Sequence, residues 1–300
     1  MNLLFVFSQH ALWEKDVGIN AHAEKWKIGF HTWSFSSMPL EEALKHVRNA
    51  GFTEVEISAD KIHLDPRVFP RSELSHLKRL LDDLDLHPNS VHAPISGVDL
   101  SAQSPNIKKR SIDLLAKTLE YCRAIECPIM VVHPNHSDSL SLGFEAMRRN
   151  SIEAIREVVG KAEELGVKVA IENMIDVRGG RFGSKVSDLR EIIKSVGSPY
   201  LGICLDTGHI NLLTSSNVSM EEEIVRAGEY LWTLHVHDND GKEDRHWPPG
   251  EGSIDWSQVI MSLRKVGYKG VFMMEIQERG DPDVLARECL RIATEMLCIR

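Results

Sequence analysis

The sequence predicts one α/β domain built as a closed (β/α)₈ barrel. From Lys27 onward, a short apolar run, a polar turn and a helical segment follow one another eight times before the chain ends at Arg300. The apolar runs are nearly continuous, which is typical of strands covered on both faces. Strict alternation of strand and helix implies parallel strands with right-handed crossovers, and eight units of this length match such a barrel. An open doubly wound sheet is the alternative, but no glycine-rich nucleotide-binding turn follows the first strand.

The predicted strands are short and rich in β-branched and aliphatic residues. In chain order they are 27–31 (KIGFH), 55–58 (VEIS), 90–93 (SVHA), 129–134 (IMVVHP), 168–173 (KVAIEN), 201–206 (LGICLD), 233–238 (TLHVHD) and 270–276 (GVFMMEI). Amphipathic stretches between them predict helices, and Gly51 and Gly166 stand where a glycine ends a helix. Residues 1–26 show weak periodicity, so we interpret them as a short N-terminal extension and 27–300 as the barrel domain.

Composition narrows the partners and the compartment. The net charge of −9 argues against broad electrostatic attraction to nucleic acid, although a local basic groove stays compatible with it. The opening residues hold only a short apolar run with no positive charge before it, which predicts neither a signal peptide nor a membrane span. The five cysteines are scattered without metal or framework spacing, as expected of reduced thiols. We therefore expect a cytoplasmic protein without membrane association, with nucleic acid a disfavoured partner.

Histidines and carboxylates gather at the carboxyl ends of the predicted strands. They are His31, His92, His133 with His136, Glu172, Asp206 with His209, His235 with His237, and Glu275. In a parallel barrel these ends meet at one mouth, where the active site lies. Imidazole and carboxylate together suit Zn²⁺, Mn²⁺ or Co²⁺ better than Mg²⁺. Burying so many ionisable groups without a metal would be costly, so the pattern predicts a metal site.

The densest part of this pattern is the segment 235–256, HVHDNDGKEDRHWPPGEGSIDW. It adds Asp244, Arg245 and His246 to the strand-end set. The PPGEG turn that follows at 248–252 would hold these side chains over the mouth of the barrel.

Several of these motifs, in this order, resemble the xylose isomerase-like TIM-barrel superfamily. They are VHAP (91–94), VVHP (131–134), IEN (171–173), CLDTGH (204–209), HVHDND (235–240), DRHWPPGEG (244–252) and MMEI (273–276). This superfamily contains the sugar and sugar-phosphate isomerases and epimerases together with the endonuclease IV enzymes. The resemblance covers roughly residues 27–298.

The nuclease branch of that superfamily implies a ligand set that the chain matches at nine positions. They are His92, His133, Glu172, Asp206, His209, His235, Asp244, His246 and Glu275. In that branch Glu172 would bridge two metals, with His92 and His133 on the first. The second would be held by Asp206, His235 and Glu275, and a third by His209, Asp244 and His246.

The epimerase branch implies a smaller core. Its metal would need only four ligands, at Glu172, Asp206, His235 and Glu275. The two glutamates would flank the substrate carbon from opposite strands and exchange its proton, which also suits general acid–base chemistry on an enediolate. His209 and an arginine would hold substrate oxygens, and Arg245 is the nearest candidate for that arginine.

Other residues have two readings each. His31 and Trp33, with Phe35, either line a sugar pocket or pack in the core. His136 and His237 each lie two residues after a proposed ligand and so point the same way along the strand. Either could support the ligands, contact substrate or serve structure alone. Arg178, Arg181 and Lys185 are expected in a solvated basic loop.

These inferences lead to one expected function and to named alternatives. We expect a divalent-metal-dependent isomerase or epimerase that acts on a small sugar, sugar phosphate or sugar acid. The alternatives are an endonuclease IV-like phosphodiesterase, a polyol or cyclitol dehydratase, and a sugar-binding subunit without turnover. A homo-oligomer stays open, because barrels of this kind often pair.

Overall fold

The computed structural model describes residues 26–60, 63–176, 179–213 and 217–298 of the chain. Residues 1–25 of the predicted extension and Arg178 lie outside this part. The predicted (β/α)₈ barrel is confirmed. Its strands, all parallel, are β1 (Ile28–His31), β2 (Glu54–Ser58), β3 (His87–His92), β4 (Ile129–Val132), β5 (Lys168–Glu172), β6 (Leu201–Asp206), β7 (Leu231–His235) and β8 (Phe272–Met274).

The barrel closes next to the residues of interest. Each strand pairs with its neighbour in chain order, and β1 also pairs with β8. The last seam, between β7 and β8, is made just beyond His235: the Val236 amide donates to the Met273 carbonyl at 2.8 Å, and the Glu275 amide donates to the Val236 carbonyl at 3.1 Å. Backbone hydrogen bonds therefore hold His235 and Glu275 in register with each other.

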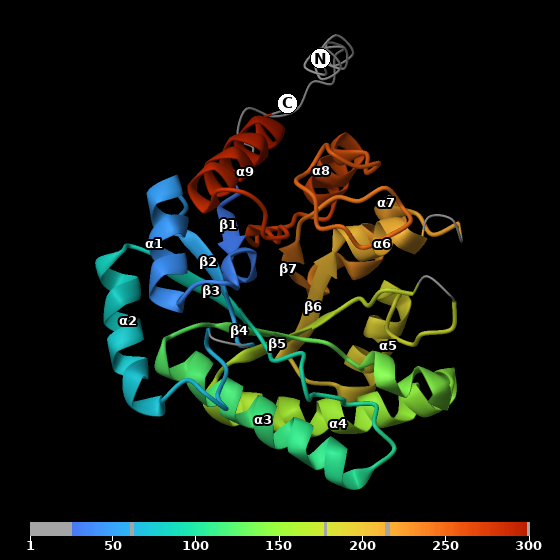
Figure 1. The fold of residues 1–300 in the computed structure, drawn as a ribbon. Coiled ribbons are helices and arrows are strands. Elements are labelled where there is room, and N and C mark those ends of the chain that lie inside the picture. The colour runs from blue at the N-terminus through green and yellow to red at the C-terminus, as the bar shows by residue number, and fades with distance from the viewer. Residues whose placement is uncertain (1–25, 61–62, 177–178, 214–216, 299–300) are drawn as a thin grey trace.

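Helices surround the strands, and the last of them contacts the first (Figure 1). They are α1 (Leu40–Ala50), α2 (Leu74–Asp83), α3 (Pro105–Ala124), α4 (Phe144–Leu165), α5 (Val186–Val196), α6 (Thr207–Leu213), α7 (Met220–Ala227), α8 (Trp256–Lys265) and α9 (Pro282–Leu297). Gly51 and Gly166 end α1 and α4 with φ of 107° and 68°, as predicted for C-terminal glycines. No helix in the described part of the chain is long and apolar enough to cross a membrane.

The inside of the barrel is largely apolar at its amino end, apart from Glu54 with its partner Lys27, and polar at its carboxyl end. At the amino end Ile129, Val131, Ala170 and Cys204 form a small buried cluster against Trp232. Trp232 fits because Gly202 faces it: a Cβ at Gly202 would lie 2.2 Å from the indole. This layer fills the barrel below the histidines and carboxylates, so these groups face only the carboxyl end.

The β7 prediction was wrong at its end. The strand was expected to run over 233–238 but ends at His235, because Asp238 exchanges backbone hydrogen bonds with Trp247 rather than with a neighbouring strand. The buried Asp238 carboxylate then accepts hydrogen bonds from the Gly250 amide and from the Trp256 indole, both at 2.9 Å. The segment 238–256 is thereby folded back over the mouth, with the PPGEG turn fixed by a buried carboxylate.

A glycine at the start of α6 makes room for the residues under this loop. A Cβ at Gly208 would lie 2.0 Å from Cε1 of His237. We expect Gly208→Ala to lower the free energy of unfolding by about 1–3 kcal/mol, the usual cost of an overpacked core. The matched control is Gly160→Ala within α4, where a Cβ meets nothing within 4 Å, and alanine there should stabilise the helix by up to about 1 kcal/mol. Chemical denaturation of both variants measures the difference, and equal stability would contradict this packing.

Candidate metal centre and active site

A cavity of about 230 Å³ opens at the carboxyl end of the barrel. His31, Trp33, Glu172, His246 and Glu275 are among its lining residues. Within the described part of the chain, no lysine or arginine lines it. The strand-end residues thus meet at one mouth, as predicted, around a space of small-molecule size.

Behind the cavity wall, carboxylates gather around one imidazole nitrogen of His235, a fully buried residue that does not itself line the cavity. Nδ1 of His235 lies 3.2 Å from a carboxylate oxygen of Glu172, 3.2 Å from one of Glu275 and 4.0 Å from one of Asp206. It is buried and has no hydrogen-bond partner in the structure. Atoms that bind one cation at about 2.0–2.2 Å lie roughly 3–3.6 Å apart, so Glu172 and Glu275 have the spacing of ligands to one divalent ion, while Asp206 lies somewhat further away. The donor atoms of Asp206, His235 and Glu275 lie within 4.8 Å of one another, whereas Glu172 groups with His92 and His235 or with Asp206 and His209. The residues of the expected four-ligand core are therefore neighbours that form overlapping groups.

The two glutamates are not diametrically opposed, as the sequence reasoning assumed. Glu172 ends β5 and Glu275 follows β8, with only β6 and β7 between these strands on that side of the barrel. Their carboxylates nevertheless converge on His235 Nδ1, and both line the cavity. They approach the cavity from strands that lie three places apart in the eight-strand order, one place short of diametrically opposite.

Three further histidines present a nitrogen to the carboxylates in a defined tautomer. Nδ1 of His92, His209 and His246 each lies 2.8–3.0 Å from a backbone carbonyl, at Ala93, Asn173 and Glu275 respectively. A carbonyl only accepts, so Nδ1 carries the proton in each ring. The Nε2 atom is left to face a carboxylate, which is the arrangement of a metal-binding histidine.

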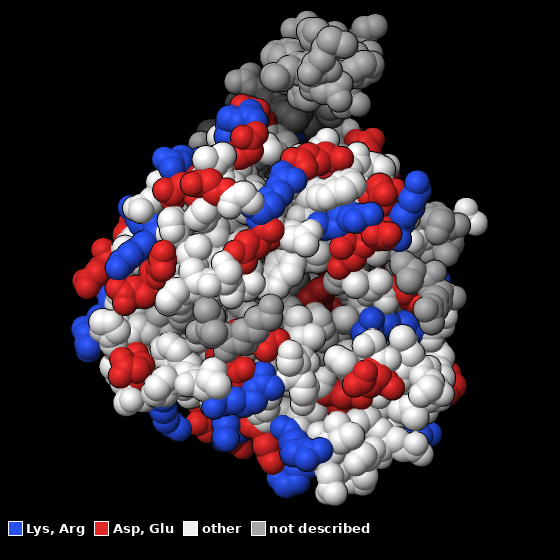
Figure 2. All heavy atoms as spheres, viewed as in Figure 1, with Lys and Arg blue, Asp and Glu red and all other residues white. Residues whose placement is uncertain are grey.

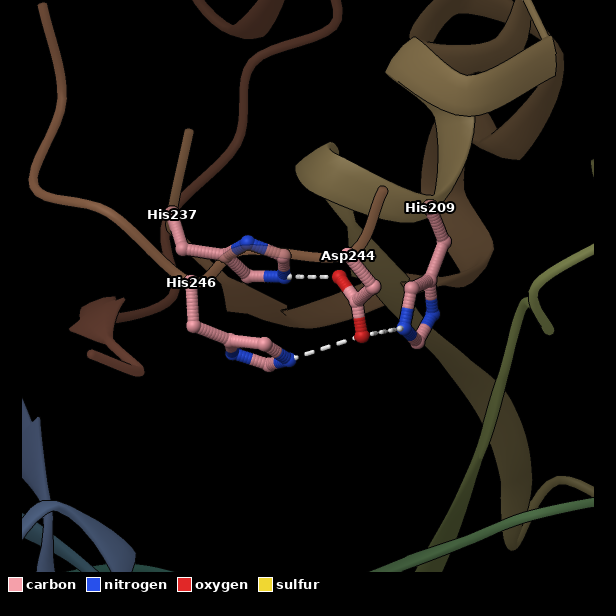
Figure 3. Close-up of side chains that lie close together, drawn as sticks. All are labelled: His209, His237, Asp244 and His246. Atoms are coloured by element: carbon pink, nitrogen blue, oxygen red, sulfur yellow. Dashed lines mark hydrogen bonds and ion pairs between the residues drawn. The ribbon is translucent and has the colours of Figure 1, made fainter. Parts of the chain in front are cut away.

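These nitrogens form two clusters beside the core. Nε2 of His92 and of His133 each lies 3.4 Å from the same oxygen of Glu172. On the other side, Asp244 lies between two rings (Figure 3): one of its oxygens is 3.0 Å from His246 Nε2 and 3.5 Å from His209 Nε2. All nine ligand positions of the nuclease branch therefore come together in space.

His237 joins the second of these clusters without lining the cavity. It is fully buried, and its Nε2 lies 2.9 Å from Asp206 and 3.9 Å from Asp244. Its ring stacks on His246 at 3.7 Å with an interplanar angle of 14°. Because imidazole lone pairs lie in the ring plane, two stacked rings do not point at one cation. Because His237 does not line the cavity, its position agrees with a role in supporting the ligands, and the expected substrate contact stays a prediction.

Burial and ion pairing shift the pKa values of the groups in this site in opposite directions. Burial favours the neutral form of His235 and His209, but nearby acidic groups outweigh it and raise the pKa of both well above the usual range. These groups are Cys204 and the carboxylates around His235, and Asp206, Asp244 and Glu172 around His209. The same balance raises the pKa of His246 to about 9. Conversely, the charges of nearby histidines outweigh burial and hold the pKa of Glu172 and Glu275 below the usual range. Without a metal, the site holds its charges as imidazolium–carboxylate pairs.

Sequence reasoning missed one carboxylate of this site. Glu56 on β2 is fully buried, and His235 Nε2 donates to it at 2.8 Å. His31 Nε2 lies 3.1 Å from the same oxygen, and the Ser90 hydroxyl donates to the other one. The signal was a glutamate inside the apolar run VEIS. A charge in a strand covered on both faces needs a buried partner.

The arginines differ from expectation. Arg245 does not line the cavity; it is half exposed and pairs with Glu243 at 2.6 Å, so the predicted substrate contact is not made in this structure. Arg181 is buried rather than solvated, and donates to Asn135 and to the Ile175 carbonyl. The rest of the lining agrees better: His31 and Trp33 line the cavity, and the Trp33 ring lies 4.9 Å from that of His246.

Sequence relatives of the chain have more than one activity. An uncharacterised protein of Methanocaldococcus jannaschii, MJ1311, is 28% identical over 281 residues, 90% of this chain and 93% of the relative. A D-psicose 3-epimerase of Enterocloster bolteae is 22% identical over 84% of this chain and 81% of its own length. A probable endonuclease 4 of Mesomycoplasma hyopneumoniae is 28% identical over 61% of this chain and 65% of its own.

Solved structures match the whole barrel. A D-tagatose 3-epimerase-like protein superposes with a TM-score of 0.76 and 26% identity, over 90% of this chain and 98% of the other. The family model described as xylose isomerase-like TIM barrel matches residues 44–296. With a confirmed eight-stranded barrel and this match over most of its length, the chain belongs to the xylose isomerase-like TIM barrel family.

Proposed function

We propose that the chain is a divalent-metal-dependent isomerase or epimerase of a small sugar or sugar derivative. Glu172, Asp206, His235 and Glu275 would hold the cation, with Mn²⁺, Zn²⁺ or Co²⁺ favoured by the mixed nitrogen and oxygen donors. Such a cation polarises a carbonyl and stabilises the negative charge that develops when a neighbouring proton leaves. Belonging to a family that contains epimerases, isomerases and endonucleases agrees with this reaction class.

One observation carries the proposal: two buried glutamates border a small cavity and share a contact with one imidazole nitrogen. Glu172 and Glu275 each lie 3.2 Å from His235 Nδ1. A carbonyl compound on the cavity floor would have a carboxylate on two sides. This is the requirement for moving a proton to and from a carbon beside a carbonyl.

The protonation of the glutamates suits this task. Since the surrounding histidines hold the pKa of both carboxyls below the usual range, each is an ionised base near neutral pH. The glutamate that takes the proton becomes the acid that can return it. Return to the adjacent carbon, with transfer of a hydroxyl proton between the two substrate oxygens, gives isomerisation. Epimerisation requires the second carboxyl to hold a proton, taken up from solvent, which it delivers to the other face of the carbon.

The cavity favours a small polar substrate over a polyanion. Its described lining has no lysine or arginine, whereas Trp33 offers an apolar ring face and His31 a polar edge for a sugar ring. Lys and Arg are interspersed with Asp and Glu on the visible face of the molecule, without a continuous basic patch (Figure 2). The chain as a whole carries a net charge of −9.

A metal-dependent phosphodiesterase is the second candidate function. The observation that favours it is the meeting of all three ligand clusters of the nuclease branch, including His92 with His133 and Asp244 with His246. Adjacent metal sites of this kind can activate water and clamp a phosphodiester. A polyol or cyclitol dehydratase would use the same core as the isomerase.

Glu275→Gln tests the proton transfer. With Mn²⁺ present, we expect the unaltered protein to exchange a substrate carbon-bound proton for deuterium from D₂O with at least one member of a panel of ketoses and sugar acids. Glu275→Gln should keep the fold and lose about 10²–10⁴-fold in exchange rate, because it removes a general acid–base group. Mass spectrometry of the recovered sugar gives the rate, and metal analysis of the same samples separates a lost ligand from a lost proton carrier.

The matched control is Glu251→Gln. Glu251 is a half-exposed glutamate of the PPGEG turn, and it pairs with Arg279. It should exchange at the normal rate. No exchange across the panel would count against the isomerase. Metal-dependent cleavage of intact or abasic duplex DNA by the same preparation would favour the phosphodiesterase.

Metal binding should release protons. A histidine with a raised pKa stabilises the metal-free fold below that pKa, and this contribution is lost as the pH rises through it. Near pH 7 His235 and His209 are therefore protonated, and a cation bound at His235 Nδ1 must displace a proton. Titrating Mn²⁺ in buffers of different ionisation enthalpy should show release of at least one proton and tighter binding at higher pH. If the heat of Mn²⁺ binding did not change with the buffer, no proton would be released, and this would contradict the protonated state of His235 and His209.

A further inference from the structure

His235 differs from three other histidines of the site in the group that contacts one of its ring nitrogens, the one that points away from Glu172 and Glu275. His92, His209 and His246 each rest against a backbone carbonyl, which fixes the ring whatever the neighbouring side chains are. The outward nitrogen of His235, Nε2, instead donates to the carboxylate of Glu56 at 2.8 Å. The orientation of this one imidazole therefore depends on another side chain.

Glu56 is itself held firmly. It has no exposed surface, and the Ser90 hydroxyl donates to one of its oxygens while His235 and His31 contact the other. Its oxygens therefore act as hydrogen-bond acceptors, one for the Ser90 hydroxyl and the other for the imidazole of His235 at 2.8 Å, so the His235 nitrogen that faces Glu56 carries a hydrogen.

His31 lies beside the same carboxylate. The Trp33 amide donates to His31 Nδ1 at 3.0 Å, so the ring proton lies on Nε2, which faces Glu56 at 3.1 Å. His31 lines the cavity, and its Nδ1 lies 4.0 Å from Glu275. Glu56 thus makes a hydrogen bond to His235 behind the cavity and lies next to His31 on the cavity wall.

We propose that Glu56 is a positioning residue of the metal centre, holding His235 so that Nδ1 faces Glu172 and Glu275. Glu56 touches neither the cavity nor the reacting atoms. It acts through His235 by selecting the tautomer with hydrogen on Nε2 and by making Nδ1 a stronger donor, as carboxylates behind metal-binding histidines do. This inference rests on the proposed function, because it concerns the affinity of the proposed cation site.

The chain offers a matched control on the same strand. Glu54 lies two residues before Glu56 on β2 and is also buried, but its ion pair is with Lys27, at 2.7 Å, rather than with a histidine of the site. A change at Glu54 alters the same strand and removes the same charge away from the metal ligands. Only a change at Glu56 should reach the cation site.

The experiment compares Mn²⁺ affinity in four proteins: unaltered, Glu56→Gln, Glu56→Met and Glu54→Gln. Glutamine keeps an acceptor for His235 Nε2, whereas methionine keeps only the volume. We expect the Kd for Mn²⁺ to rise roughly 10-fold in Glu56→Gln and about 100-fold in Glu56→Met. Glu54→Gln should bind Mn²⁺ as the unaltered protein does. The visible spectrum of the Co²⁺-loaded proteins should change only in the Glu56 variants.

The outcomes separate the two proposals. If the unaltered protein binds no Mn²⁺, the proposed function fails. If it binds Mn²⁺ and both Glu56 variants bind equally well, the positioning role is overturned while the metal site stands. Equal losses for Glu56→Gln and Glu56→Met would assign the effect to charge alone and would also overturn it. Should Glu56→Met not fold, Ser90→Ala releases one oxygen of Glu56 and should weaken Mn²⁺ binding measurably.

Discussion

The barrel buries a group of carboxylates whose only charged partners in the described structure are histidines. Glu56, Glu172, Asp206 and Glu275 are all below a tenth exposed, and their ion pairs lead to imidazoles rather than to lysine or arginine. Buried carboxylates without positive charge nearby would be strongly destabilising. An imidazole is positive only when protonated, so protons or a divalent cation must supply the charge. The stability, metal affinity and pH behaviour of the site are therefore linked.

The fold brings these carboxylates and histidines together and shields them from bulk water. The Trp232 layer fills the lower barrel, and the seam at Val236 ties His235 to the strand that leads into Glu275. Above them, Asp238 holds the returning loop that carries Asp244 and His246. Because each ligand comes from a different strand end or a fixed loop, the donor atoms are positioned before any ligand arrives. Such preorganisation is what acid–base chemistry on a sugar needs.

The sequence predicted the architecture and most of the site for a simple reason: strand ends of a parallel barrel must converge, and Glu172, Asp206, His235 and Glu275 end strands or directly follow them. It did not predict contacts that depend on side-chain direction. Glu56 lies within a strand, where only its unpaired charge marked it. The end of β7 was misplaced because it is decided by hydrogen bonds between Asp238 and Trp247, within the loop that follows the strand. The sequence left the role of His237 open, because the placement of its ring depends on the space left by Gly208.

The same donors that support an isomerase also complete the clusters of a phosphodiesterase, so the number and place of the bound ions distinguish the two most directly. Anomalous diffraction at the manganese edge from crystals soaked in Mn²⁺ tests this without assuming a substrate. Our account predicts the strongest peak between His235 Nδ1 and the carboxylates of Glu172, Asp206 and Glu275. A strongest peak between Asp244 and His246 with none at His235, or no peak among these residues, would contradict it.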